Sequence, residues 1–340
     1  MKKELLHIAL LVQLILLVPL VSCVDNEEQD NTPIGNFEAL WKIIDEHYCF
    51  FDYKQHEYGL DWNEVYNRYK VRVSDKMSSN QLFEVLCDML GELRDGHVNL
   101  TSSMDFGRYW KWQENYPKNY SDTLERRYLG TDYKIAGGLT YRVLDDNIGY
   151  IRYASFTNPV GEGNLDDCLS YLALCRGLII DIRNNGGGDL TTAERLAGRF
   201  VHEKTLVSYI QHKTGMGHND FSPLEPRFLE PSSNMRWHKA VCVLTNRSVF
   251  SAANDFAVMM RTLPNVLLVG DHTGGGSGLP MSNSLPNGWT VRYSASPMYD
   301  RKKQQTEFGI SPDVSVSFND EATAQGIDPI IETARELLTK

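Results

Sequence analysis

Cysteine is scarce in this sequence, and the cysteines present show no pairing pattern. The chain has 6 cysteines in 340 residues, and no two of them stand in a C-x-x-C arrangement. Disulfide-stapled domains and zinc ribbons depend on such spacings. The sequence therefore excludes a disulfide framework and a zinc-ribbon fold.

Positive charge is also in short supply. Lys and Arg number 34 against 44 Asp and Glu, which gives a formal net charge of −10. A chain this acidic repels the phosphates of DNA and RNA, so we expect no nucleic-acid partner. The 42% hydrophobic and 23% charged residues are typical of a globular protein with a sizeable core.

Signatures of several enzyme classes are missing. The 9 histidines are scattered without an H-E-x-x-H pair, so no metal is expected. The glycine-rich turns at 184–188 and 273–278 match neither a P-loop nor a dinucleotide fingerprint, so no nucleotide cofactor is expected. A G-x-S-x-G elbow is absent too, which counts against an α/β-hydrolase.

One long apolar run does occur, at the N-terminus. Residues 5–21 form an apolar run after two lysines, broken mainly by His7 and Gln13, and the segment closes with Leu20-Val21-Ser22-Cys23. The run is short for a transmembrane helix and has the flanks of a secretory signal. Its closing residues resemble the lipobox of bacterial lipoproteins, in which the cysteine is lipidated; the alternative is an ordinary signal with an incidental Cys23. We expect a signal peptide over 1–22, an acidic tether over 23–34, and a membrane-anchored lipoprotein.

Hydrophobic periodicity divides the rest of the chain. Over residues 35–100 apolar positions recur at helical spacing, and a helix capped by Ser78 is expected to end at Gly96. Residues 101–135 lack a clear period and are predicted to be an irregular connection. Over 136–340 buried strands alternate with helices. The expected fold class is α/β, preceded by a small helical N-terminal domain.

Ser251 stands where a strand is predicted to meet a helix. Residues 240–245 have the pattern of a buried strand, and a helix is expected to open at Ser251. A hydroxyl there lies beside free N-terminal amides, which suits a nucleophile with an oxyanion site. The commoner use of serine at this place is as a helix cap, and that alternative stays open. Ser248 and Ser277 are rival nucleophiles, although no helix follows Ser277.

Five short motifs follow one another along residues 35–340. They are Asp95-Gly96-His97, Asp181-Ile182-Arg183-Asn184-Asn185-Gly186-Gly187-Gly188, Asn246 through Ser251-Ala252-Ala253, Val269-Gly270-Asp271 with the next glycines, and Glu307-Phe308-Gly309. Their order and spacing resemble those of the S41 peptidases, which include C-terminal processing (tail-specific) proteases and the tricorn core protease. The resemblance implies a ClpP/crotonase-like catalytic domain that cleaves unfolded or short peptides.

The resemblance also implies the roles of individual residues. Ser251 would be the nucleophile, His97 the general base, and Glu307 the group that holds the imidazole or steadies its charge. The amides of Ala252 and of Gly187, or of its neighbour Gly186, would bind the oxyanion. Each position also has an ordinary structural alternative: a satisfied elbow histidine, a solvated glutamate and a tight glycine turn.

Departures from the family pattern bear on the mechanism. Processing proteases of the family pair the serine with a lysine, but the corresponding position, 25 residues after Ser251, is Gly276. The tricorn-like branch uses histidine and glutamate and has a serine before the histidine, where this chain has Gly96. A histidine base predicts activity that rises through an apparent pKa of about 6–7. Asp181 and Arg183 are expected to tie a strand to the core.

Two further expectations concern partners and place in the cell. Residues 101–140 are too few for the PDZ module that processing proteases carry, so none is expected. The partners would be a peptide or unfolded protein and, through the lipid anchor, a membrane of a Gram-negative-type envelope, on the periplasmic side or at the cell surface. The alternative from another class is a weak or inactive member that binds a peptide or hydrophobic ligand, since the family includes retinoid-binding relatives.

Overall fold

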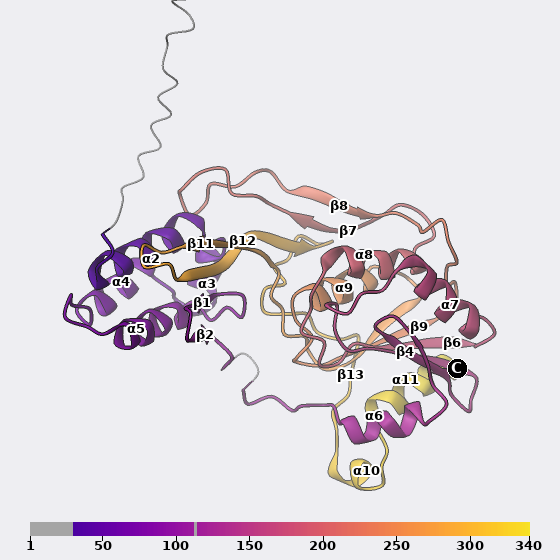
Figure 1. Cartoon of the computed structure of the whole chain (residues 1–340). Helices are drawn as coiled ribbons and strands as arrows, with labels where there is room; N and C mark the ends of the chain where they lie inside the picture. The colour runs from indigo at the N-terminus through magenta and orange to yellow at the C-terminus, as the bar shows by residue number, and fades with distance from the viewer. Residues whose placement is uncertain (1–29, 112–113) are drawn as a thin grey trace, which may run out of the picture.

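The computed structural model describes residues 30–111 and 114–340 (Figure 1). The predicted signal peptide over 1–22 and the lipidation site Cys23 lie outside the described residues. In the described part, none of the helices combines the length and the apolar character needed to cross a bilayer.

Four helices open the described chain. They are α2 (Pro33–His47), α3 (Phe51–Tyr58), α4 (Trp62–Lys70) and α5 (Ser79–Gly91). Ser78 and Gln81 form the expected capping box at the start of α5, which satisfies two backbone donors reciprocally. The expected end of this helix at Gly96 is wrong: α5 stops at Gly91, and a turn leads from there to His97.

The larger sheet has seven strands in the order β13-β10-β9-β6-β5-β4-β3. Their bounds are β3 (Lys134–Ala136), β4 (Leu139–Val143), β5 (Ile148–Tyr153), β6 (Gly177–Asp181), β9 (Val241–Thr245), β10 (Val266–Gly270) and β13 (Val314–Ser315). The five strands from β5 to β13 are parallel, and β3 and β4 add antiparallel strands at one edge. Every residue of β6 and β9 is buried, as expected for central parallel strands.

Helices cover both faces of this sheet, so it forms the middle of three layers (Figure 1). Leu178 and Ile180 of β6 pack with α7 (Glu162–Leu172), α8 (Leu190–Ala197) and α9 (Ala252–Met260). Ile179 points to the other face, where α6 (Asp122–Leu129) and α11 (Pro329–Thr339) lie. A short turn η2 (Gly198–Phe200) follows α8, and α10 (Asp320–Ala324) precedes α11. The predicted α/β class is confirmed.

A second sheet connects the helical region to the three layers around the larger sheet. Its order is β2-β1-β12-β7-β8, with β11 also paired to β12. The bounds are β1 (Asn99–Thr101), β2 (Phe106–Arg108), β7 (Thr205–Ile210), β8 (Glu225–Leu229), β11 (Gly278–Ser284) and β12 (Thr290–Asp300). The first half of β12 pairs with β1, and its last residues pair with β7. This long strand therefore holds the helical region and the α/β region together.

The structure departs from the predicted division at two points. The core of the helical region includes Leu285, Val291 and Tyr293, which come from the late β11–β12 hairpin. The stretch predicted as an irregular connection, 101–135, contains β2 and α6. The hairpin reaches the helical core through contacts between residues far apart in the sequence, and β2 and α6 are too short to show a clear period.

Candidate active site

Ser251 lies in the turn between β9 and α9, at the carboxyl end of the parallel strands. Its backbone has φ 57° and ψ −126°, and its side chain makes no capping hydrogen bond. A helix-cap serine has extended backbone and bonds the helix amides, so Ser251 does not serve as an ordinary cap. Its N–H donates to Gly275 O at 2.8 Å, and its carbonyl accepts from Asp255 N at 2.9 Å. This strained conformation is held from both sides and leaves the hydroxyl for another partner.

That partner is His97. The distance from His97 Nε2 to Ser251 Oγ is 2.9 Å, although the residues are 154 positions apart. The backbone N–H of His97 donates to Asp95 Oδ1 at 2.7 Å, and the backbone carbonyl of His97 accepts from Asn99 Nδ2 at 3.0 Å. The imidazole packs on the Phe250 ring with 4.8 Å between ring centroids. The backbone of the elbow and the aromatic ring therefore fix the imidazole beside the serine hydroxyl.

The electrostatic surroundings keep His97 neutral. Burial lowers its pKa to about 4; the Asp95 carboxylate opposes this, and Arg292, Arg108 and Lys54 add to it. The range of 6–7 expected from the sequence assumed a lightly perturbed imidazole, and His97 is only 4% exposed. A neutral imidazole can accept a proton from Ser251 without first losing one.

Glu307 does not contact His97 through a hydrogen bond. Its Oε1 accepts from Lys54 Nζ at 3.2 Å, and its Oε2 accepts from Ser277 N at 3.1 Å. His97 Nδ1 has no hydrogen-bond partner among the described residues. The structure thus brings Ser251 and His97 together, and the expected direct link from Glu307 to the imidazole is wrong, because a buried lysine and a backbone amide hold the carboxylate elsewhere.

The residue that sequence reasoning missed is Lys54, on α3. Its ammonium is fully buried and donates to the carbonyls of Leu93, at 2.6 Å, and Arg94, at 3.4 Å. It also lies 3.9 Å from Asp95 Oδ2 and 3.2 Å from Glu307. Lys54 therefore connects the backbone just before the His97 elbow to Glu307. No spacing signal marks it, because its partners lie between 39 and 253 positions away.

One cation thus stands between two carboxylates. Burial would raise the pKa of Asp95, but Lys54, His97 and hydrogen-bond donors lower it, and Tyr48 and Ser294 both donate to Oδ2. Burial raises the pKa of Glu307 to about 8; Asp95 adds to this rise, and Lys54 opposes it. Asp95 therefore keeps the negative charge, and Glu307 is the carboxyl that binds a proton first.

The position of the family's lysine is closed by an aromatic ring. Gly276 has φ +76°, and a Cβ built on it would lie 2.3 Å from the Phe250 ring. A side chain there would have to displace the ring that packs on His97. The packing around the imidazole therefore leaves no room for a lysine side chain at position 276.

The two expected sources of oxyanion donors lie against Ser251. A Cβ on Gly187 would come within 2.8 Å of Ser251 Cβ and 2.9 Å of Ala252 N, so only glycine permits this approach. The Gly187 N–H already donates to Asn185 Oδ1 at 3.0 Å. Ala252 is the first residue of α9, and its amide has no acceptor within the helix. Asn185 Oδ1 thus accepts a hydrogen bond from the amide of Gly187 and none from the amide of Gly186.

The rival serines are placed differently. Ser277 Oγ is buried with no partner among the described residues, and Ser248 N donates to Asn246 Oδ1 at 3.2 Å. In the described part of the chain, no group of three or more His, Cys, Asp or Glu side chains is arranged to hold a metal ion.

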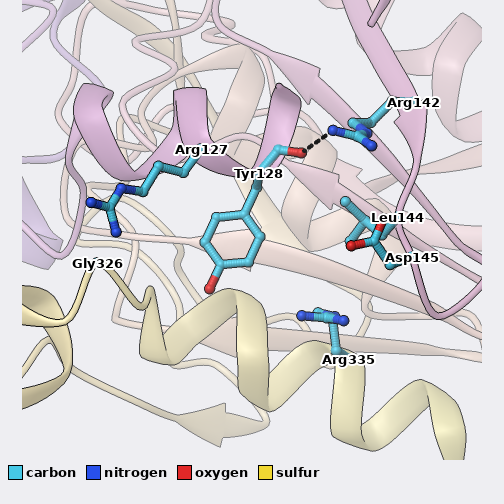
Figure 2. A pocket seen from close by; sticks show the side chains of 7 residues that line it. All are labelled: Arg127, Tyr128, Arg142, Leu144, Asp145, Gly326 and Arg335. Atoms are coloured by element: carbon cyan, nitrogen blue, oxygen red, sulfur yellow. Dashed lines mark hydrogen bonds between the residues drawn. The ribbon is translucent and has the colours of Figure 1, made fainter. Parts of the chain in front are cut away.

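Two hollows lie away from the Ser251 hydroxyl. A groove of about 660 Å³ runs between the end of α5 and β2, and Arg108 lines it. A cavity with a volume of about 210 Å³ lies between α6, β4 and α11, and Figure 2 shows the side chains around it. It is lined by Arg127, Tyr128, Arg142, Leu144, Asp145, Gly326 and Arg335. None of the candidate catalytic residues lines either hollow, but the groove borders the elbow, because Arg108 Nε donates to Gly96 O.

Family models match two parts of the chain. The model for peptidase family S41 matches residues 147–316, half of the chain, and that for the tricorn protease C1 domain matches 30–91. The carboxy-terminal processing protease CtpA of Bacillus subtilis (strain 168) is 24% identical over 187 residues, which are 54% of this chain. The match spans 38% of the length of that protein.

Solved structures extend the likeness over nearly the whole chain. The crystal structure of a peptidase from Parabacteroides merdae ATCC 43184 is similar with a TM-score of 0.87 and 52% sequence identity, covering 92% of this chain and 98% of that one. Mature CPAF is similar in fold alone, with a TM-score of 0.69 at 13% identity over 90% of this chain and 96% of that one. The family match and the 52% identity together show that the chain belongs to peptidase family S41, a family of serine peptidases.

Proposed function

We propose that this protein is an endopeptidase that cleaves unfolded or short peptides with Ser251 as nucleophile and His97 as general base. The observation that carries the proposal is the 2.9 Å contact between His97 Nε2 and a serine held at positive φ. A serine that caps a helix, or a histidine satisfied by the protein backbone, would not require this arrangement.

In the proposed mechanism, Ser251 Oγ attacks the scissile carbonyl while His97 Nε2 takes the hydroxyl proton. The C–N bond then breaks, and the imidazolium gives this proton to the leaving amine. A water molecule next attacks the acyl-enzyme, again losing a proton to His97, which returns it to Ser251 Oγ as the acid product leaves. Because burial lowers the pKa of His97, the imidazole is neutral at neutral pH and can accept a proton before each of the two attacks.

We propose that the Ala252 amide and the Gly186 amide bind the oxyanion. The support for Ala252 is its place at the N-terminus of α9, next to the nucleophile. The support for Gly186 over Gly187 is the hydrogen bond that already engages the Gly187 amide. Loss of one such donor typically lowers kcat by about 10²–10³-fold.

We propose extended peptides as the substrates. β2 is the last strand of its sheet and has one paired neighbour, so its other edge offers backbone groups to an added strand. The groove of about 660 Å³ lies along this strand. A chain segment must be unfolded to pair in this way, so folded proteins should be poor substrates.

The proposal is tested with a fluorophosphonate probe and an internally quenched peptide library. Wild type and Ser248→Ala should be labelled and should cleave peptides, whereas Ser251→Ala should do neither. Ser248 is the matched control because it lies in the same turn. If Ser251 is not labelled and wild type cleaves no more than Ser251→Ala, the protein is a binding member of the family instead.

We also propose that the protein is an exported lipoprotein anchored through Cys23, on the periplasmic side or at the cell surface. The support is the sequence pattern of residues 1–23 alone, since they lie outside the described residues. Cys23→Ala should move the protein from the membrane fraction to the soluble exported fraction. Unchanged membrane association would refute lipid anchoring at this residue.

A further inference from the structure

Two arginines lie on the same side of the second sheet, one on each side of Asn99. Asn99 of β1 pairs with Arg108 of β2 and with Arg292 of β12. Directly opposite residues of antiparallel strands point to the same face. Asn99 Nδ2 donates to the His97 carbonyl, so this row of three side chains begins two residues from the candidate base.

Both arginines lie close enough to His97 to influence its charge. Arg108 Nε donates to Gly96 O, and its guanidinium carbon lies 5.7 Å from the centroid of the Phe250 ring that packs on His97. The charges of Arg292 and Arg108 each lower the pKa of His97, which places both within electrostatic reach of the imidazole. Arg108 also lines the groove beside β2, so it stands between the groove and the elbow.

Neither guanidinium forms an ion pair with a carboxylate of the described residues. The buried Arg152 and Arg183 and the mostly buried Arg227 do form such pairs, with Glu125, Asp181 and Asp255, whereas Arg108 is half-buried and Arg292 is exposed. The carboxylate that influences Arg108 and Arg292 is Asp95, which already accepts from Tyr48, Ser294 and His97. Two guanidinium groups that form no ion pair with the described residues therefore lie on the face of the sheet next to the elbow that carries His97.

We propose that Arg108 and Arg292 form a subsite for a carboxylate of the peptide substrate, either an Asp or Glu side chain or the C-terminal carboxylate. The inference rests on the proposed function and names the substrate class of the same site. Guanidinium groups bind carboxylates through paired, charge-assisted hydrogen bonds. The two strands hold them at a fixed spacing on one face, so a carboxylate bound there would fix the register of the peptide against Ser251.

The first test compares peptides of one core sequence that carry Glu, Gln or Lys at each position in turn, with a free or amidated C-terminus. Wild type should cleave the peptide with the correctly placed carboxylate about 10- to 100-fold faster in kcat/KM than its neutral counterpart. A loss confined to amidated peptides identifies the C-terminal carboxylate. A loss confined to Glu→Gln peptides identifies a side chain.

The decisive variant is Arg292→Glu, because Arg292 is exposed and its change leaves the Gly96 contact of Arg108 in place. It should invert the preference towards the Lys peptide, which a purely structural role would not do. Arg126→Glu is the matched control, since it makes the same change of charge on an exposed residue of α6. Equal preferences in Arg292→Glu and wild type, or the same inversion in Arg126→Glu, would overturn the inference.

Binding to Ser251→Ala separates this inference from the proposed function. A fluorescent Glu peptide should bind this variant more tightly than the Gln peptide, and Arg292→Glu should remove the difference. If wild type is active but shows no preference in cleavage or binding, the subsite inference alone fails. If the binding preference is present and Ser251 shows no activity, the proposed function fails and the subsite stands.

Discussion

Two buried charge clusters of this protein combine the same kinds of ionisable group but lie in different surroundings. The arginine cluster is Arg183 with Asp181 and Asp328, at the carboxyl end of β6 and the start of α11. The lysine cluster is Lys54 with Asp95 and Glu307, between the helical region and the catalytic loops. Each has one cation between two carboxylates, with side chains that are at most 2% exposed.

The arginine cluster is fully satisfied. Arg183 donates to both oxygens of Asp181 at 2.6–3.2 Å and to Asp328 Oδ2 at 2.9 Å. Asp328 Oδ1 in turn accepts from the first amides of α11. Burial would raise the pKa of Asp181, but Arg183, Arg152 and Tyr150 together lower it. This planar, forked contact fixes a strand to a helix, which agrees with the structural role expected for Asp181 and Arg183.

The lysine cluster is looser and lies at the site of the chemistry. Lys54 spreads its donors over two backbone carbonyls and Glu307, and the pKa of Glu307 rises to about 8 through burial and Asp95. A forked arginine makes a rigid joint, whereas the single ammonium of a lysine has no planar fork. Burial raises the pKa of one carboxyl in each cluster, Asp328 in the first and Glu307 in the second. The comparison indicates that the first cluster holds the fold and the second positions the elbow with His97.

The largest expected effect follows removal of the arginine cluster's cation. Arg183→Met removes the cation that lies between two buried carboxyl groups and should lower the free energy of unfolding by about 3–5 kcal/mol. Urea unfolding measures this, with Arg126→Met as an exposed control that should change stability by about 0.5 kcal/mol or less. If the two variants are equally stable, the structural role of Arg183 is wrong.

A smaller loss of stability is expected for Lys54→Met, together with a loss of rate. At pH 6 the loss should be about 2–3 kcal/mol, because Glu307 already carries a proton at this pH and only the Asp95 carboxylate loses the ammonium. kcat should fall by about 10²-fold, since the carbonyls of Leu93 and Arg94 lose the donor that holds the elbow. Lys54→Met/Glu307→Gln should recover neither stability nor kcat at pH 6, because Glu307 is already neutral there and the Asp95 carboxylate still lacks the ammonium. Recovery of both would show that Lys54 acts through its charge alone.

The smallest effect is expected for Glu307→Gln. Its kcat should fall by only about tenfold, because Glu307 does not bond His97 and glutamine can keep the contact with Ser277 N. The folded-state pKa of about 8 exceeds the ordinary 4.5, so this group's stabilising contribution is complete below pH 4.5 and is lost as pH rises through 8. Unfolding from pH 6.5 to 9, above the range in which His97 titrates, should show a decline in wild type that Glu307→Gln lacks. A loss of kcat as large as that of His97→Ala would contradict this account.

Most of the fold could be predicted from local patterns in the sequence. The Ser78 capping box and the buried strand β6 follow from their own residues and immediate neighbours. The meeting of Ser251 with His97 could be expected only from the order of the family motifs, because 154 positions separate them. These features depend on spacing that the sequence displays directly.

What the sequence could not show depends on long-range packing. Lys54 sits on a short polar helix, and nothing near it indicates burial beside Glu307, 253 positions later. The low pKa of His97 comes from its burial, with the Phe250 ring packed against the imidazole. The expected bond between Glu307 and His97 failed for the same reason: the direction of a carboxylate is set by its donors, here Lys54 and Ser277, which the motif does not specify.

The most direct test of the central claim is the pH dependence of Ser251 labelling by a neutral fluorophosphonate. The probe has no ionisable group, so its second-order rate reports the activation of the serine alone. The rate should rise with pH through a midpoint of about 4, where His97 loses its proton, and stay level from pH 6 to 8. A midpoint above about 8, where a lysine titrates, or an unchanged profile in His97→Ala, would contradict His97 as the base.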